Sequence, residues 1–256
     1  MNNIFSMRRF SQLFVNHTIA SYRMYSMSFG VLMGILFLMM VYASAENKFI
    51  LSENARQMFF TTFMFIGGAI FTTGIFSNLG DKRKAIAYLM LPASNFEKFL
   101  VAWLYSFVIF QLVYVAGFYL IDLTVMSLGK RVTNESAIMN FGADFRYSTL
   151  LLAFAWIHSM GFFGAILFKK LHFIKTAFSV FVLLLLVVLL NKFSIDWMMG
   201  ASVETGEPFG SLMIYEGKKS YFLERSEMIW LVPYLTASIA LLLWVGAYFK
   251  LKETEV

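Results

Sequence analysis

The sequence predicts an all-α integral membrane protein, and its composition and long apolar segments are the main reasons. Of the 256 residues, 59% are hydrophobic and 14% are charged, and the mean hydropathy is +0.70. Soluble domains carry about 25% charged residues, so a soluble fold of this size could not bury so much apolar surface. The 30 phenylalanines, 12 tyrosines and 5 tryptophans suit lipid-facing and interfacial positions. Because cysteine is absent, disulfides, thiolate metal sites and cysteine nucleophiles are excluded.

Six apolar segments are long enough to cross a bilayer, for which a helix needs about 20 residues. An open sheet cannot cross lipid because its edge groups would remain unpaired, so each segment is predicted to be a helix. We expect one transmembrane domain over residues 1–256, with a six-helix bundle over 25–249. The predicted spans are residues 25–44, 57–78, 96–122, 147–168, 174–192 and 228–249.

The charge distribution predicts that both termini are cytoplasmic. The N-terminus, the loops 78–98 and 169–175, and the C-terminus carry twelve basic and four acidic residues, whereas the other side carries nine basic and eleven acidic ones. Basic residues are retained on the cytoplasmic side, most strongly in short loops. The net charge of +6 is explained in this way, and we expect no nucleic-acid partner.

A second interpretation of the N-terminal region is a cleaved signal peptide, because Ala43-Ser44-Ala45 resembles a signal-peptidase site. The apolar segment before it has about 19 residues and the polar part ahead of that has more than about 20, and both exceed what a signal peptide normally has. A membrane span that is retained is therefore the favoured interpretation.

Residues 1–24 are predicted to form an interfacial helix ahead of the first span. Apolar side chains recur at helical spacing over residues 4–20, and Arg8 and Arg9 occupy the polar flank. Such an amphipathic helix lies in the membrane interface with its apolar face toward lipid. It is either a passive anchor or a lever on the cytoplasmic surface.

Residues 79–95 are predicted to form a charged helical elbow between the second and third spans. This stretch holds the densest basic cluster of the chain, followed by a half-apolar segment that Pro92 ends. A loop that only joins two spans needs no apolar face, so the pattern predicts that another protein docks here. A solvated loop is the alternative. The expected docking residues are Asp81, Lys82, Arg83, Lys84, Tyr88 and Leu89.

The third span is predicted to open with a capping box made by Ser94 and Glu97. In this motif the serine hydroxyl accepts from the backbone N–H of the glutamate, and the carboxylate accepts from the backbone N–H of the serine. At the other end of the span, Asp122 is expected to remain hydrated at the membrane boundary, because a buried acid would be costly.

The fourth span contains His158, the one histidine deep in an apolar stretch. It could relay protons or bind substrate, which would also permit an intramembrane enzyme, or it could bond to a neighbouring helix. Glycines in the second and fourth spans predict close helix packing. The fifth span has no polar handle and is expected to face lipid.

Residues 193–227 form the longest polar segment and are predicted to be an extracytoplasmic loop with a short helical or hairpin excursion. Residues 250–256 form a cytoplasmic tail. The sequence has no GxxxxGK[ST] loop, no HExxH motif and no GxSxG elbow. We therefore expect no enzymatic activity and no cofactor on this chain, and any energy for transport must come from another protein.

This arrangement resembles the permease subunits of ABC-2 type exporters. The stretch SNLGDKRKAIAYLMLPASNFEKFLVAWL, residues 77–104, is similar to the corresponding part of ABC-2 permeases found in Bacteroidetes. The resemblance implies that residues 81–91 are a coupling helix, which seats in a cleft of a separate ABC ATPase subunit that binds the ATP. It also implies a second permease copy or homologue, alternating access, and a place in the bacterial inner membrane. Re-entrant helices before the last span are a further feature of the family, expected here within residues 194–226.

The function predicted from these observations is that of the permease subunit of an ATP-driven exporter, surrounded by membrane lipid. The alternative is a non-transporting scaffold that anchors a complex in the membrane. The two differ in whether the chain and its partners move a substrate when nucleotide is supplied.

Overall fold

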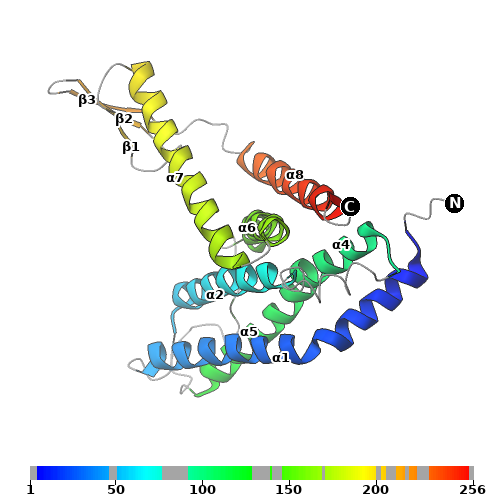
Figure 1. Ribbon diagram of the computed structural model, residues 1–256. Coiled ribbons are helices and arrows are strands. Elements are labelled where there is room, and N and C mark those ends of the chain that lie inside the picture. The colour runs from blue at the N-terminus through cyan, green and yellow to red at the C-terminus, as the bar shows by residue number, and fades with distance from the viewer. Residues whose placement is uncertain are drawn as a thin grey trace.

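The computed structural model describes residues 5–45, 51–76, 92–128, 139, 146–168, 171–199, 203–205, 212–216, 219–223 and 231–253. Helices make up most of this part of the chain (Figure 1). They are α1 (Met7–Ala45), α2 (Glu53–Gly74), α4 (Asn95–Trp103), the π-helix η2 (Leu104–Ile109), α5 (Phe110–Leu128), α6 (Tyr147–Leu167), α7 (His172–Met199) and α8 (Leu231–Glu253).

Five helical stretches of the described chain are long and apolar enough to cross a membrane. They are α1, the continuous run Asn95–Leu128 that contains α4, η2 and α5, and the helices α6, α7 and α8. A multi-pass membrane protein is therefore supported. The second predicted span is helical as α2 but is not among these five stretches. The count of six spans stays a prediction.

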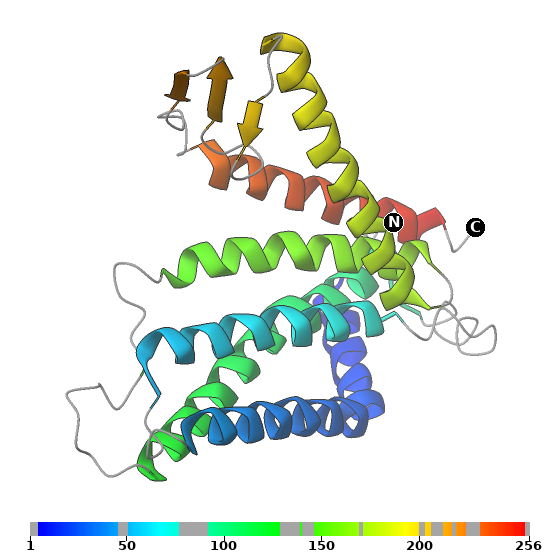
Figure 2. The same ribbon diagram turned by 90° about the vertical axis from the view of Figure 1, so that its left-hand side faces the viewer.

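The N-terminal helix and the first span are one helix, α1, of 39 residues. Figures 1 and 2 show that α1 changes direction between its two parts. Part of its apolar stripe packs on protein: Leu13 is buried, and Phe10 and Phe14 pack beside it. This part is covered because α4 and η2 lie against it. The outward face carries Arg8, Val15 and other exposed side chains. The interfacial position of this segment stays a prediction.

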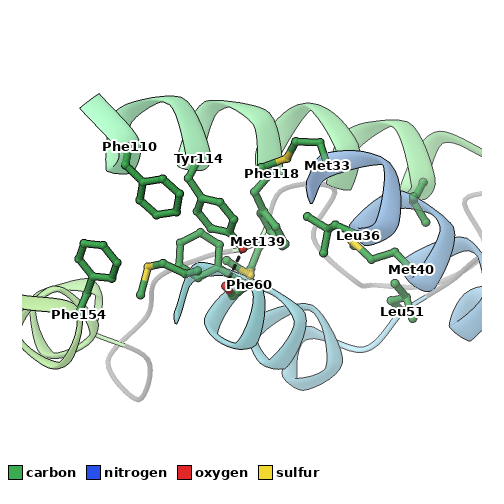
Figure 3. Close-up of a cluster of buried hydrophobic side chains, with 12 residues drawn as sticks. Met33, Leu36, Met40, Leu51, Phe60, Phe110, Tyr114, Phe118, Met139 and Phe154 are labelled. Carbon is green, nitrogen blue, oxygen red and sulfur yellow. Dashed lines mark hydrogen bonds between the residues drawn. The ribbon is translucent and has the colours of Figure 1, made fainter. Parts of the chain in front are cut away.

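The buried apolar side chains form two clusters. The first, here called the α5 core, is centred on α5 residues such as Tyr114 and Phe118, which pack with Phe60 of α2 and Leu36 of α1 (Figure 3). The second, the α4 core, contains Leu13, Phe76, Val101, Ala102, Tyr105, Phe162, Ala165, Ala247 and Leu251, with Ile75 and Ile166. Each core contains side chains from several helices, so the two cores together hold the helices against one another.

A small sheet lies between α7 and α8 in the order of the chain. Its strands are β1 (Val203–Thr205), β2 (Leu212–Glu216) and β3 (Lys219–Leu223), all antiparallel in the order β1-β2-β3. Met213 pairs with Glu204 on one side and with Phe222 on the other. The expected hairpin excursion is thus present, whereas the described part of residues 194–226 shows α7 and strands in place of the re-entrant helices.

The helix α7 leans away from the remaining helices in both views (Figures 1 and 2). Its large apolar side chains are exposed along most of its length, from Phe173 to Met198. Near its start, however, Thr176 packs on Gly164 of α6. The exposure agrees with the expectation that this segment faces lipid.

Gly164 allows α7 to approach α6, and this generates a test. A Cβ atom at Gly164 would lie 2.2 Å from Oγ1 and 2.8 Å from Cβ of Thr176, so the short side chain cannot swing aside. We expect Gly164→Ala to destabilise the protein by about 1–3 kcal/mol, since overpacking forces the helices apart. Thermal unfolding in detergent measures the effect.

The matched control is Gly161→Ala, one turn earlier on the same helix. A Cβ atom there would lie 3.5 Å from Thr72, an ordinary contact, and alanine favours the helix by about 1 kcal/mol over glycine. Equal unfolding temperatures for the two variants would contradict the packing of α7 on α6.

Candidate functional site

The predicted docking elbow lies outside the described residues. This applies to all six docking positions, which are Asp81, Lys82, Arg83, Lys84, Tyr88 and Leu89. The structure does describe both flanks: Phe76, which is buried after the end of α2, and Pro92, just before α4. The candidate site is therefore formed by the contacts that the chain makes directly after the elbow, at the start of α4.

The start of α4 is held by the capping box that the sequence predicts. The backbone N–H of Glu97 donates to Ser94 Oγ at 3.2 Å, and the backbone N–H of Ser94 donates to Glu97 Oε2 at 2.8 Å. The two bonds satisfy donors that a helix start leaves without partners. This prediction is confirmed.

The second oxygen of Glu97 binds the N-terminal segment, which the sequence did not reveal. Glu97 Oε1 accepts from the backbone N–H of Ser6 at 2.7 Å and from the Arg9 guanidinium at 3.0 Å and 3.3 Å. The Glu97 side chain is fully buried, whereas that of Arg9 is 35% exposed. A buried carboxylate needs paired charge and hydrogen bonds. Glu97 therefore fixes the start of α1 against the start of α4.

Aromatic rings extend this junction to α8. Phe96 stands edge-on to Phe5 at 6.2 Å between ring centroids and to Tyr248 at 6.1 Å. Phe99 meets Tyr248 in the same way, at 5.7 Å. Such edge-to-face pairs are favourable contacts. The start of α1, the start of α4 and the end of α8 therefore form one unit, here called the Glu97 junction.

The Glu97 junction can be tested with a double-mutant cycle. Glu97→Gln keeps a side chain that serves in a capping box but removes the charge that Arg9 binds, and Arg9→Met removes the same bond from the other side. We expect a coupling energy of about 1 kcal/mol, reduced from the value for a buried pair because Arg9 is partly exposed. Denaturation of the two single variants and the double variant measures it.

Arg8→Met is the matched control, because Arg8 is exposed on the outward face of the same helix turn. It should show no coupling with Glu97→Gln. A zero coupling energy for Arg9 would mean that the bond seen in the structure contributes nothing to stability.

His158 is fully buried on α6 and is bound on both ring nitrogens. Trp244 Nε1 donates to His158 Nδ1 at 3.0 Å, and His158 Nε2 lies 2.8 Å from Ser106 Oγ. An indole N–H only donates, so Nδ1 accepts and the proton of the neutral imidazole sits on Nε2. The Ser106 hydroxyl then donates to the carbonyl of Ala102 at 2.8 Å. Of the roles left open for His158, this geometry matches a bond between neighbouring helices.

Asp122 is the main correction at the other end of the third span. It was expected to be hydrated, but it is fully buried and forms an ion pair with the equally buried Arg56, in the first turn of α2. Arg56 Nε donates to Asp122 Oδ1 at 2.7 Å, and the second guanidinium nitrogen contacts Oδ2. The two-point geometry suits an arginine and a carboxylate. The prediction was wrong because it considered Asp122 without Arg56, which lies 66 residues earlier in the sequence.

The buried ion pair predicts a non-additive response. Asp122→Ala should destabilise the protein by about 3–5 kcal/mol, because it leaves a guanidinium buried without its carboxylate. Adding Arg56→Met should recover part of that loss by removing the buried charge. Chemical denaturation of the single and double variants tests this, and a double variant less stable than Asp122→Ala would contradict it.

An apolar hollow of about 120 Å³ lies between α2, α6 and α7. Its lining includes Ala69, Trp156, Met160 and Phe173. Among the residues that the structure describes, no three histidine, aspartate or glutamate side chains gather as they would around a metal ion.

No family model, no curated protein and no solved structure matches this chain. The structure itself establishes helices long enough for several membrane crossings and a set of buried polar contacts between them. Sequence reasoning found Ser94, Glu97 and His158 but missed Arg9, Arg56, Ser106 and Trp244. Of these four, Ser106 is the one polar side chain that stands in an apolar stretch, between Tyr105 and Phe107, and this placement could have pointed to it.

Proposed function

We propose that this chain is the permease subunit of an ATP-driven exporter of the ABC-2 type. In this proposal a separate ABC ATPase subunit binds and hydrolyses ATP, and the permease moves substrate by alternating access. The observation that carries the proposal is the Glu97 junction, which lies directly after the basic elbow and ties the elbow's exit to α1 and α8.

The junction supports the proposal because a motor outside the membrane needs a stiff connection to the spans. Force applied at residues 81–91 would enter α4 at Asn95, two residues before Glu97, and pass through the hydrogen bonds of Glu97 into α1. The aromatic contacts with Tyr248 would carry it into α8. A loop that merely connects two spans requires no such buried carboxylate.

The remaining parts of the proposal rest on the charge, the apolar helices and the resemblance to ABC-2 permeases. The basic elbow and both termini lie on the cytoplasmic side, as the excess of lysine and arginine indicates, and the resemblance to ABC-2 permeases implies the bacterial inner membrane. A second permease copy or homologue completes the pathway, and membrane lipid surrounds the exposed apolar faces. The chain supplies no cofactor site, since ATP binds to the partner subunit.

Docking of the ATPase is tested by co-purification. We expect the triple variant Lys82→Asp, Arg83→Asp, Tyr88→Ala to lose most of the bound ATPase, because reversing two charges repels a complementary acidic surface. The measurement is the amount of ATPase recovered with the tagged permease from solubilised membranes.

Lys192→Asp is the control, because Lys192 is exposed near the end of α7, at a site far along the chain from the elbow. It should retain the ATPase. If the triple variant also retains it, the elbow is not the docking site. Vesicles that contain permease and ATPase then test transport: a scaffold would show no nucleotide-dependent movement of any substrate.

A further inference from the structure

A six-residue π-helix interrupts the longest helical run after α1. Residues Leu104–Ile109 form η2 between α4 and α5, all within the continuous apolar stretch Asn95–Leu128. A π-helical turn contains more residues than an α-helical one and is rare, and it marks places where a helix bends or changes its packing. No proline accounts for the interruption, since none occurs between residues 93 and 128.

The π-helix coincides with the boundary between the two cores. The part before and within it contributes Val101, Ala102 and Tyr105 to the α4 core, whereas α5 contributes Phe110 and the residues after it to the α5 core. The same division applies to α1, whose Leu13 belongs to the α4 core and whose later residues belong to the other, and this is the helix that changes direction (Figures 1 and 2).

Each side of the boundary is anchored independently. On the α4 side, Glu97 binds Ser6 and Arg9. On the α5 side, the Tyr114 hydroxyl donates to the carbonyl of Phe60 at 2.7 Å (Figure 3), and Asp122 pairs with Arg56. The two halves of this helical run are held by different polar contacts and are joined through the irregular segment, while α6 contributes side chains to both cores.

A series of hydrogen bonds crosses the boundary between the two cores at η2. It runs from Trp244 on α8 through His158 on α6 to Ser106 in η2 and ends at the carbonyl of Ala102. The Phe107 ring lies edge-on to both His158 and Trp244, at 5.2 Å and 5.4 Å. Removing the Ser106 hydroxyl would leave the buried His158 Nε2 proton without its acceptor.

We propose that η2 is a hinge between the two cores and that the hydrogen bond between His158 and Ser106 holds it in the observed state. His158 is then a positioning residue that sets the orientation of α4 relative to α5. The hinge goes beyond the proposed exporter function and does not depend on it, because it follows from the cores, their anchors and the π-helix alone.

The absence of cysteine allows the hinge to be tested with pairs of spin labels at introduced cysteines. The pair Gln12 and Lys252 lies on the α4 side, the pair Leu38 and Leu120 lies on the α5 side, and the pair Gln12 and Leu120 crosses the hinge. All four side chains are exposed. Pulsed electron paramagnetic resonance of the full chain in lipid nanodiscs gives the three distance distributions.

We expect the crossing pair to show two distance states and each of the other pairs to show one narrow state. Ser106→Ala should change the ratio of the two states about fivefold, the effect of roughly one net hydrogen bond, without widening the other distributions. Ser159→Ala is the matched control: Ser159 is also buried, adjoins His158 and bonds only to the carbonyl of Trp156 among the contacts described. It should leave the ratio unchanged.

Two results would overturn the proposal. A crossing pair as narrow as the other two, in the native chain and in Ser106→Ala alike, would show that η2 does not bend. An unchanged ratio in Ser106→Ala would show that the bond does not hold the hinge. If Ser106→Ala does not fold, His158→Phe removes the same bond while keeping an aromatic ring among Phe107, Phe154 and Phe162.

Discussion

The carboxylate of Glu97 is the contact on which the arrangement of one whole end of this protein depends. A buried anion must gather donors, and this one takes them from its own helix start and from the segment ahead of α1. The pairing brings together residues almost ninety positions apart. It acts together with the apolar packing of Leu13, Phe10 and Phe14, which holds this part of α1 against α4 and η2.

The same principle governs two other sets of buried polar groups. Arg56 and Asp122 satisfy each other between α2 and α5, and His158 is satisfied by Trp244 and Ser106 between three elements. Lipid offers no hydrogen bonds, so each of these groups must find its partner on another helix. Polar contacts therefore specify which helices are neighbours, while the aromatic side chains fill the space between them.

Much of the fold could be predicted from the sequence, because the length and apolarity of a span are local properties. The predicted 147–168 and the observed α6 (Tyr147–Leu167) differ by one residue, and the capping box of Ser94 and Glu97 has a fixed local spacing. Pairings between distant residues could not be predicted. Asp122 was expected at a hydrated edge because no residue near it in the sequence indicates that Arg56 is its partner. The packing of Leu13 on α4 could not be predicted for the same reason, since periodicity identifies an apolar face but not what covers it. The elbow docking residues stay a prediction, as do the partners.

The long exposed surface of α7 has a consequence for how the chain is assembled. Its 28 residues touch the body chiefly near the start, where Thr176 meets Gly164. A segment so apolar partitions into the bilayer without help from other helices. We therefore expect α7 to insert autonomously during synthesis and to dock on α6 afterwards. The helix α8, which follows α7 in the chain, would then pack its Tyr248 ring on Phe96 and Phe99 at a later stage.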